Sequence, residues 1–270
     1  MLQMSAFTAS IPNTAADQQL LAIADGLIPT RDNALVVPPD LPRVIATMFY
    51  GVNMTVAKLK PASLRRFGDY WVLPVANAIG GSGAISPYLD LSDSPISGPP
   101  LLLDPQEELP AYAQQSSAGA QQAYAAVIFG ETGSKKHSGK FFTVRATGTA
   151  TLVANSWSTV TPVMDTGLPA GRYNLVGARV RSAGCLFFRF VIVQQFHRPG
   201  GFGFQDASSF EPVGQRLGGW GVWGNFDHLS IPNVEIISTS ADTSETIYMD
   251  LEQTSAVVSP DTHTQPYRPV

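Results

Sequence analysis

The sequence predicts an all-β fold of two tandem eight-stranded jelly rolls, with one or two short helices in the loops. Three observations lead to this prediction. The chain holds 24 Gly and 21 Pro among 270 residues, a larger share than the usual roughly 12%, which favours many turns. Short runs rich in Val, Ile, Thr and aromatic residues recur between these turns. The two halves of the chain repeat one pattern of strands and bends.

The clearest strand signal is a hairpin between Leu168 and Phe204. Residues alternate between apolar and polar from Tyr173 to Arg181, small residues at 182–184 can turn the chain, and a second strand follows. Burying one large apolar side chain contributes about 1.5–3 kcal/mol. The second strand is therefore expected to form the core of the second roll, through an apolar face of Leu186, Phe188, Phe190 and Ile192.

The first half contains less regular strand signals. Residues 17–28 fit either a short helix or a strand, and Pro61 to Arg66 fits a helical turn. A helix is expected from Asp104 to about Ala118, because Asp104 can cap it and Pro105 suits its first position. Strands are expected at 35–37, 43–50, 54–59, 70–76, 101–103 and 124–129.

The second half is more plainly β-structured. Besides the hairpin, we expect strands at 141–145, 149–153, 157–163, 234–237 and 246–251. The hairpin also has a fainter counterpart in the first half. A Leu-Pro pair, a strand, a turn and a returning strand run from Leu41 to Phe67, as they do from Leu168 to Arg198.

This repeat sets the expected domain boundaries. Residues 1–16 read as an N-terminal arm and 17–130 as the first jelly roll. A small, polar stretch at 131–140 reads as a linker, 141–252 as the second jelly roll, and 253–270 as a polar C-terminal tail.

Composition restricts the class of function. Charged residues make up only 14% of the chain, and the net charge is −4. Such a chain lacks the basic face of a nucleic-acid-binding protein. The low charge fits either a neutral surface rich in Ser, Thr and Gln, or a surface covered by neighbouring subunits, and we favour the second. With Cys185 as its one cysteine, the chain forms no internal disulfide. We expect neither a signal peptide nor a membrane-spanning helix.

No pattern for catalysis stands out, so we expect no enzyme activity, no cofactor and no metal. The four histidines lack metal-ligand spacing. The sequence from Gly219 to Gly224 matches the dinucleotide-binding motif G-x-G-x-x-G, but it is not followed by the helix pattern that such a site requires. Five residues are the candidates for contacts between subunits, the arginines because they lie off the apolar faces of the hairpin and the tryptophans because of their large packing area: Arg179, Arg181, Arg189, Trp220 and Trp223.

The tandem β units, the low charge and the polar arms resemble the double jelly-roll major capsid proteins of tailless icosahedral bacteriophages, the lineage that includes the adenovirus hexon. Residues 168–203, followed by Gly218 to Asp227, carry the likeness most closely. The resemblance implies a virion protein made in the host cytoplasm, whose homotrimers form pseudo-hexagonal capsomers. It leaves open, as partners, minor capsid, spike or penton proteins and an internal membrane.

Two other functions remain open. A carbohydrate- or receptor-binding β-sandwich, such as a spike or tail component, could use Trp220 and Trp223 as a stacking platform. A jelly-roll enzyme of the cupin kind is the third alternative, although its metal-ligand histidines are missing.

Overall fold

The computed structural model describes residues 1–66, 68–72, 84–85, 88–90, 101–130, 140–193, 195–203, 215–241 and 244–256. Almost all of the regular structure is β. The strands lie in five antiparallel sheets, and a single 3₁₀ turn, η1 (Ala62–Leu64), is the helical element named among the described residues. No described helix has the length and apolarity needed to cross a bilayer.

The second half folds as a jelly roll. The eight strands of this fold are lettered B to I in chain order and form two sheets, BIDG and CHEF. Here the BIDG sheet has the order β15-β23-β18-β21 and the CHEF sheet the order β16-β22-β19-β20. In chain order the strands are β15 (Phe141–Gly148), β16 (Ser158–Val160), β18 (Gly171–Arg181), β19 (Cys185–Val191), β20 (Gly200–Phe202), β21 (Gly224–Asp227), β22 (Asn233–Ser238) and β23 (Glu245–Ala256).

The first half repeats this topology. Its BIDG sheet runs β1-β14-β6 and then, against β6, the three short strands β9, β10 and β11. Its CHEF sheet runs β13-β7-β8, with β2 along β13, where Leu20 N–H donates to Ala111 O at 2.9 Å. The strands are β1 (Leu2–Ile11), β2 (Thr14–Gln19), β6 (Arg43–Val52), β7 (Met54–Leu59), β8 (Tyr70–Val72), β9 (Ala84–Ile85), β10 (Tyr88–Asp90), β11 (Leu101–Leu102), β13 (Ala111–Gln115) and β14 (Gln121–Gly130). The predicted fold of two tandem jelly rolls is therefore confirmed.

Each roll carries one additional strand at the same place. In the first roll β3 (Leu21–Ala22) pairs with β1, and in the second roll β17 (Val163–Met164) pairs with β15. In both rolls this strand follows strand C and extends the BIDG sheet beyond strand B. The first roll also has a small sheet in its loops, built from β4 (Thr30–Arg31), β5 (Ala34–Val36) and β12 (Glu108–Leu109).

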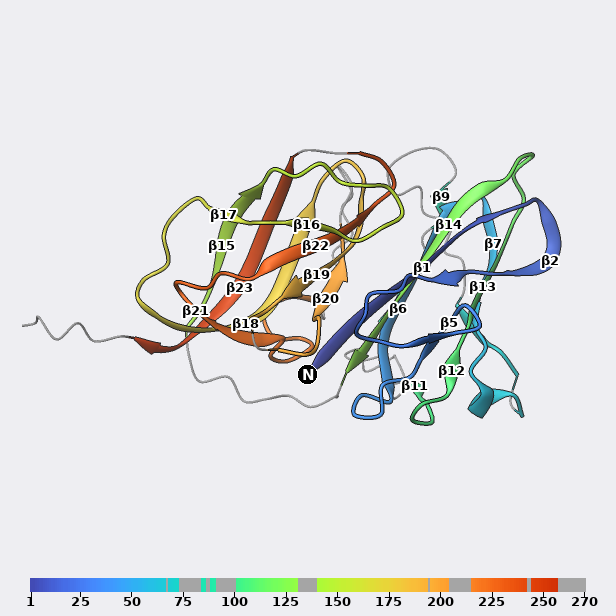
Figure 1. Ribbon diagram of the computed structural model, residues 1–270, viewed down its shortest axis with the longest axis horizontal. Coiled ribbons are helices and arrows are strands. Elements are labelled where there is room, and N and C mark those ends of the chain that lie inside the picture. The colour runs from blue at the N-terminus through green and yellow to red at the C-terminus, as the bar shows by residue number, and fades with distance from the viewer. Residues whose placement is uncertain are drawn as a thin grey trace, which may run out of the picture.

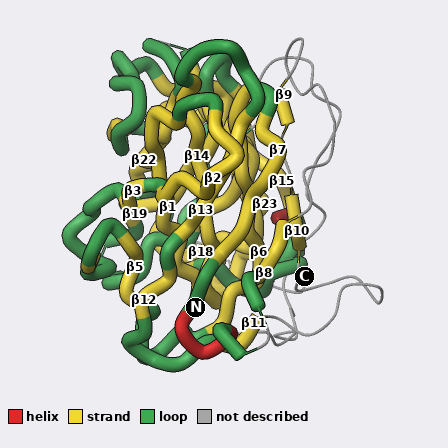
Figure 2. Tube along the Cα trace, turned by 90° about the vertical axis from the view of Figure 1, so that its right-hand side faces the viewer, coloured by secondary structure: helices red, strands yellow, loops and turns green. Residues whose placement is uncertain are grey.

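The four main sheets stack as successive layers. From right to left in Figure 1 these are the first CHEF sheet, the first BIDG sheet, the second CHEF sheet and the second BIDG sheet. Figure 2 views this stack from the first CHEF sheet, with the long strands upright and loops gathered at both ends. Every pairing between described strands joins strands of the same half, so the two rolls do not share a sheet.

Two apolar clusters hold the layers together. One lies inside the first roll and includes Phe7, Phe49 and Phe129. The other fills the second roll and continues across its CHEF sheet to Leu2 and Ile128 on the first BIDG sheet. Burial of this kind contributes about 25 cal/mol per Å² of apolar surface, so the contact between the rolls is a continuation of the core.

Residues 1–16 do not form the expected arm. β1 pairs with β14 along its whole length, from Leu2 opposite Gly130 to Ile11 opposite Gln121, and β2 follows it from Thr14. The ambiguous segment 17–28 contains strands rather than a helix. At the other terminus β23 extends to Ala256, four residues into the expected tail, and residues 257–270 lie outside the described part of the chain.

The helix expected from Asp104 to Ala118 is also wrong. Gln106 has a positive φ of 65°, which interrupts a helix, and Pro110 removes a backbone donor. From Ala111 onward buried and partly exposed residues alternate, and this period of two is that of a strand. The helical turn expected at Pro61 to Arg66 is confirmed by η1. The expected linker falls almost entirely on residues 131–139, which lie outside the described residues.

Candidate assembly interfaces

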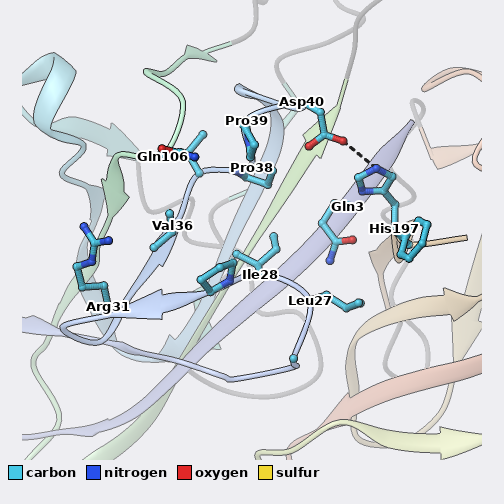
Figure 3. A pocket seen from close by; sticks show the side chains of 14 residues that line it. Gln3, Leu27, Ile28, Arg31, Val36, Pro38, Pro39, Asp40, Gln106 and His197 are labelled. Carbon is cyan, nitrogen blue, oxygen red and sulfur yellow. Dashed lines mark ion pairs between the residues drawn. The ribbon is translucent and has the colours of Figure 1, made fainter.

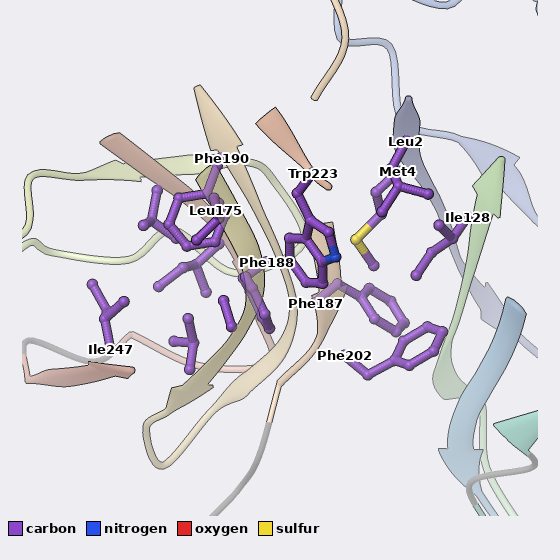
Figure 4. Packing of buried hydrophobic residues seen from close by; sticks show 14 of the residues in the cluster. Leu2, Met4, Ile128, Leu175, Phe187, Phe188, Phe190, Phe202, Trp223 and Ile247 are labelled. Atoms are coloured by element: carbon purple, nitrogen blue, oxygen red, sulfur yellow. The ribbon is translucent and has the colours of Figure 1, made fainter. Parts of the chain in front are cut away.

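The seam between the rolls, meaning the contact of the first BIDG sheet with the second CHEF sheet, is apolar at its centre. Leu2 and Met4 of β1 and Ile128 of β14 face Phe187 and Phe202 of the second roll (Figure 4). All five side chains are at most 1% exposed. Phe187 therefore packs on the face opposite to Phe188, so both faces of strand β19 are buried.

A buried charged cluster lies beside this apolar centre. Arg189 of β19 forms ion pairs with Glu235 of β22 at 2.6 Å and with Asp25 of the first roll at 2.5 Å. Its guanidinium carbon also lies 4.0 Å from the centroid of the Trp157 ring. The side chains of Arg189 and Asp25 are 3% and 2% exposed. Because a buried charge without a partner is costly, this cluster fixes how the two rolls sit against each other.

Further hydrogen bonds cross the seam. Met4 N–H donates to Arg198 O at 2.9 Å, and Arg198 N–H donates to the Gln3 side-chain oxygen at 2.6 Å. The Tyr124 hydroxyl donates to Asn155 Oδ1 at 2.6 Å, and burial raises the pKa of Tyr124 to about 12. These bonds satisfy polar groups that the seam would otherwise leave buried and unpaired.

Gly200 allows β1 to approach this closely. A Cβ atom at this position would lie 2.8 Å from Met4 Sδ and 2.3 Å from Phe188 O. Any side chain at Gly200 would therefore clash with the backbone of β19 as well as with the Met4 side chain of β1. At this point of the seam the large Met4 side chain on strand B of the first roll lies against Gly200, which has no side chain, on strand F of the second roll.

A pocket of about 580 Å³ opens beside the seam (Figure 3). Its wall is mainly apolar, from Leu27 to Pro29 and from Val36 to Pro39, and His197 Nε2 lies 3.0 Å from Asp40 Oδ2 at its rim. Phe196, at the same rim, is 87% exposed. The pocket can accommodate an apolar group, and among the described residues that line it there is no paired nucleophile and base.

Trp220 and Trp223, two of the predicted contact residues, belong to the interior. They are 6% and 2% exposed, and their rings stack with an 18° interplanar angle. Trp223 also stacks on Phe188, and Trp220 packs edge-on against Phe202. The two tryptophans therefore link the core of the second roll to the seam, and they are not accessible to another subunit.

The outer face of the second BIDG sheet, which we call the BIDG end face, carries the other two predicted arginines. Arg181 is exposed, and Arg179 lies 3.2 Å from the fully buried carboxylate of Asp250. The Thr143 hydroxyl donates to the same carboxylate at 2.6 Å. Arg145 pairs with Asp165, the residue directly after β17. This face is polar, although Phe141 at the start of β15 is 40% exposed.

The outer face of the first CHEF sheet, the CHEF end face, carries a charged cluster that the sequence did not reveal. Lys58 of β7 lies 2.7 Å from Asp17 and 2.9 Å from Asp69, and Lys60 lies 2.7 Å from Asp17. Burial alone would raise the pKa of Asp17, but hydrogen bonds from Lys58, Lys60 and Gln114 outweigh it and lower the pKa to about 2. Lys58 Nζ also lies 4.2 Å from the ring centroid of Trp71, which is 55% exposed.

The five predicted contact residues are thus divided by the structure. Arg189, Trp220 and Trp223 are buried within the chain, which corrects their assignment to a surface between subunits, whereas Arg179 and Arg181 lie on the BIDG end face. A pattern of alternating residues cannot tell a side chain buried within the chain from one exposed on an end face. The pattern shows which residues share a face of the strand, but not what covers that face.

The described residues hold no cluster of His, Cys, Asp and Glu that could bind a metal ion.

Comparison with known proteins yields structural similarities with high coverage but low TM-scores and low sequence identity. No family model and no curated protein matches the sequence. The major capsid protein P2 from bacteriophage PM2 matches with 13% identity and a TM-score of 0.23, covering 94% of this chain and 98% of that chain. A chain in the atomic structure of Sulfolobus Turreted Icosahedral Virus matches with 9% identity and a TM-score of 0.20, covering 92% and 91%. At these scores the assignment of the fold depends on the strand order described above.

Proposed function

We propose that this chain is a virion structural protein, the major capsid protein of an icosahedral shell, and that it acts as a homotrimer with a pseudo-hexagonal outline. The observation that carries the proposal is the tandem stacking of two rolls with the same strand order. A shell protein needs a rigid, repeated unit with surfaces for further copies, and this stack provides such a unit.

The stack is directional, which supports assembly into a ring. At the seam a BIDG sheet contacts a CHEF sheet, so the two sides of the contact differ. In the described part of the chain, the stack of sheets ends on one side in a CHEF sheet and on the other side in a BIDG sheet, and neither outer face packs against a further roll. Contacts between unlike surfaces generate closed rings when the rotation per unit divides a full turn. Three chains with two rolls each place six rolls around such a ring.

Native mass spectrometry of the purified full chain tests the proposal. We expect a species of three 28.8 kDa chains, and negative-stain electron microscopy should show particles with a hexagonal outline. A chain that stays monomeric at micromolar concentration, with the β spectrum of a folded protein, would contradict the proposed trimer.

The carbohydrate- or receptor-binding alternative loses the observation that motivated it. Trp220 and Trp223 are the stacking platform on which it depended, and both rings are buried among the aromatic side chains of the second roll. A glycan would have to displace this packing in order to reach them.

A further inference from the structure

In both rolls strand B pairs in the same register with the additional edge strand, β3 in the first roll and β17 in the second. In the first roll Ile23 N–H donates to Ala6 O at 2.9 Å, and in the second roll Asp165 N–H donates to Arg145 O at 3.1 Å. Ala6 of β1 therefore corresponds to Arg145 of β15. Two residues earlier on the same face, Met4 corresponds to Thr143.

Strands E and F also share a register between the rolls. In the second roll Arg189 of β19 pairs with Gly200 of β20, and in the first roll Lys58 of β7 pairs with Trp71 of β8. Lys58 and Arg189 are each the fifth residue of strand E, and both form ion pairs with carboxylates. Each also lies against an indole ring, Trp157 before strand C for Arg189 and Trp71 on strand F for Lys58. Lys58 thus corresponds to Arg189, and Trp71 corresponds to Gly200.

These correspondences make the seam a template for a contact that the single chain leaves incomplete. We infer that the CHEF end face of one chain binds the BIDG end face of a second copy, with Trp71 of one chain against Thr143 of the other. This inference deepens the proposed trimer and rests on it. The contact between Met4 and Gly200 within the chain is the counterpart of the Thr143–Trp71 contact between chains.

The sizes of the side chains fit this exchange. In the seam the large Met4 on strand B meets Gly200, which has no side chain. Between copies the large residue would be Trp71 on strand F, and the small one Thr143 on strand B. Both are exposed in the single chain, as expected of residues that a second copy covers, and Trp residues are enriched in such contacts.

The acidic residue at the edge of this contact, Asp165, resembles Asp25 at the edge of the seam. The segment after β3 carries Asp25 to Arg189 across the seam, and the segment after β17 carries Asp165. Asp165 lies two residues before the position that matches Asp25, and the Lys58 side chain is only 6% exposed. We therefore assign the partner of Asp165 in the second copy to Lys60. Asp165 and Lys60 side chains are 34% and 31% exposed, which leaves both accessible.

Cysteine cross-linking of the full chain tests the contact directly. A Trp71→Cys/Thr143→Cys variant treated with a short bis-maleimide should give covalent dimers and trimers on a denaturing gel, because each chain then presents one cysteine to each neighbour. The natural Cys185 is buried and stays unreactive. The two single variants should remain monomeric on the same gel. Each contact between chains then contains only one cysteine, and the reagent needs two.

A matched control uses Leu229, which is 83% exposed and lies in the loop after β21. The Trp71→Cys/Leu229→Cys variant should give no cross-linked trimer, and cross-linking equal to that of the Thr143 pair would overturn the inference. A trimer seen by native mass spectrometry without cross-linking of the Thr143 pair would also overturn it, while leaving the proposed function intact.

A second variant covers the case in which the cysteine pair disturbs folding. Thr143→Arg places a long charged side chain on the contact, and we expect it to abolish the trimer while circular dichroism shows a folded monomer. Leu229→Arg should keep the trimer. A Thr143→Arg chain that remains trimeric would count against the contact, whereas a wild-type chain that never forms trimers would contradict the proposed function itself.

Discussion

Corresponding positions of the seam and of the BIDG end face carry residues of opposite character. Met4 and Ile128 are cross-strand partners in the seam, and the matching partners on the BIDG end face are Thr143 and Asp250. The backbone arrangement is alike, so the side chains determine the difference. Apolar residues make the seam a permanent part of the fold, because separating it would expose them to water. The polar residues on the BIDG end face can lie against water in a single chain without this cost.

The largest expected loss of stability comes from removing a charge in the seam, and the same change on the BIDG end face should cost little. Arg189→Ala removes the common partner of Asp25 and Glu235 and should lower the free energy of unfolding by about 3–5 kcal/mol, because it leaves buried carboxylates without a counter-charge. Chemical denaturation followed by tryptophan fluorescence measures this loss.

Arg145→Ala is the matched control on the BIDG end face. Its partner Asp165 is partly exposed, and exposed ion pairs contribute little to stability, so the midpoint of denaturation should hardly change. Equal losses in the two variants would show that the seam and the end face do not differ in the way proposed.

A smaller effect is expected from closing the gap at Gly200. Gly200→Ala places a methyl group 2.3 Å from Phe188 O and 2.8 Å from Met4 Sδ, and such overpacking costs about 1–3 kcal/mol. Gly167→Ala, where a Cβ would meet no atom within 4 Å, should leave the melting temperature unchanged or slightly higher. Differential scanning calorimetry of both variants measures the comparison, and a Gly200→Ala chain as stable as wild type would argue against tight packing of β20 between β19 and the Met4 side chain.

The smallest expected effect concerns the CHEF end face at low pH. The pKa of Asp17 is about 2 in the folded chain, against an ordinary value of 3.8. The carboxylate therefore stabilises the fold above pH about 4, and this contribution is lost as the pH falls towards about 2. Urea unfolding across this interval should show a smaller decrease for Asp17→Asn than for wild type. Identical decreases would mean that the ion pairs with Lys58 and Lys60 do not form in solution.

The second roll could be predicted from the sequence because its signals are local. The alternation from Tyr173 to Arg181 and the apolar face beginning at Leu186 set both strands and their register, and the structure confirms the inward position of that face. The repeat in the first half was also recognisable, since Leu41 to Phe67 includes strands D and E of the first roll.

Strand β1 was not recognised because residues 1–16 are small and polar, with Pro12 and Asn13, and so were expected to form an arm. The alternation of Gln3 and Ser5 with Leu2, Met4 and Ala6 is nevertheless the pattern of a strand. In the structure Gln3 and Ser5 are at most 1% exposed, because β1 is covered on both faces and Gln3 bonds to the backbone of Arg198. The Gln3 side chain thus finds its hydrogen-bond partner 195 residues away in the sequence.

The seam cluster was missed for the same reason. Arg189 and Asp25 are separated by 164 residues, and no local pattern connects them. The adjacent glycines Gly200 and Gly201 were a usable signal, because glycine within a strand often marks the close approach of another backbone.

The position of β1 also has a consequence for the order in which the chain can fold during synthesis. Strand β1 pairs with β14, which begins at Gln121, and contacts Arg198 across the seam, so it leaves the ribosome well before these partners. Synthesis must therefore continue past Arg198 before β1 has all its partners. Contacts this distant in the sequence slow folding, and incomplete chains with an unpaired apolar strand are prone to aggregation. We expect nascent chains of this protein to need protection by chaperones until the second roll has emerged.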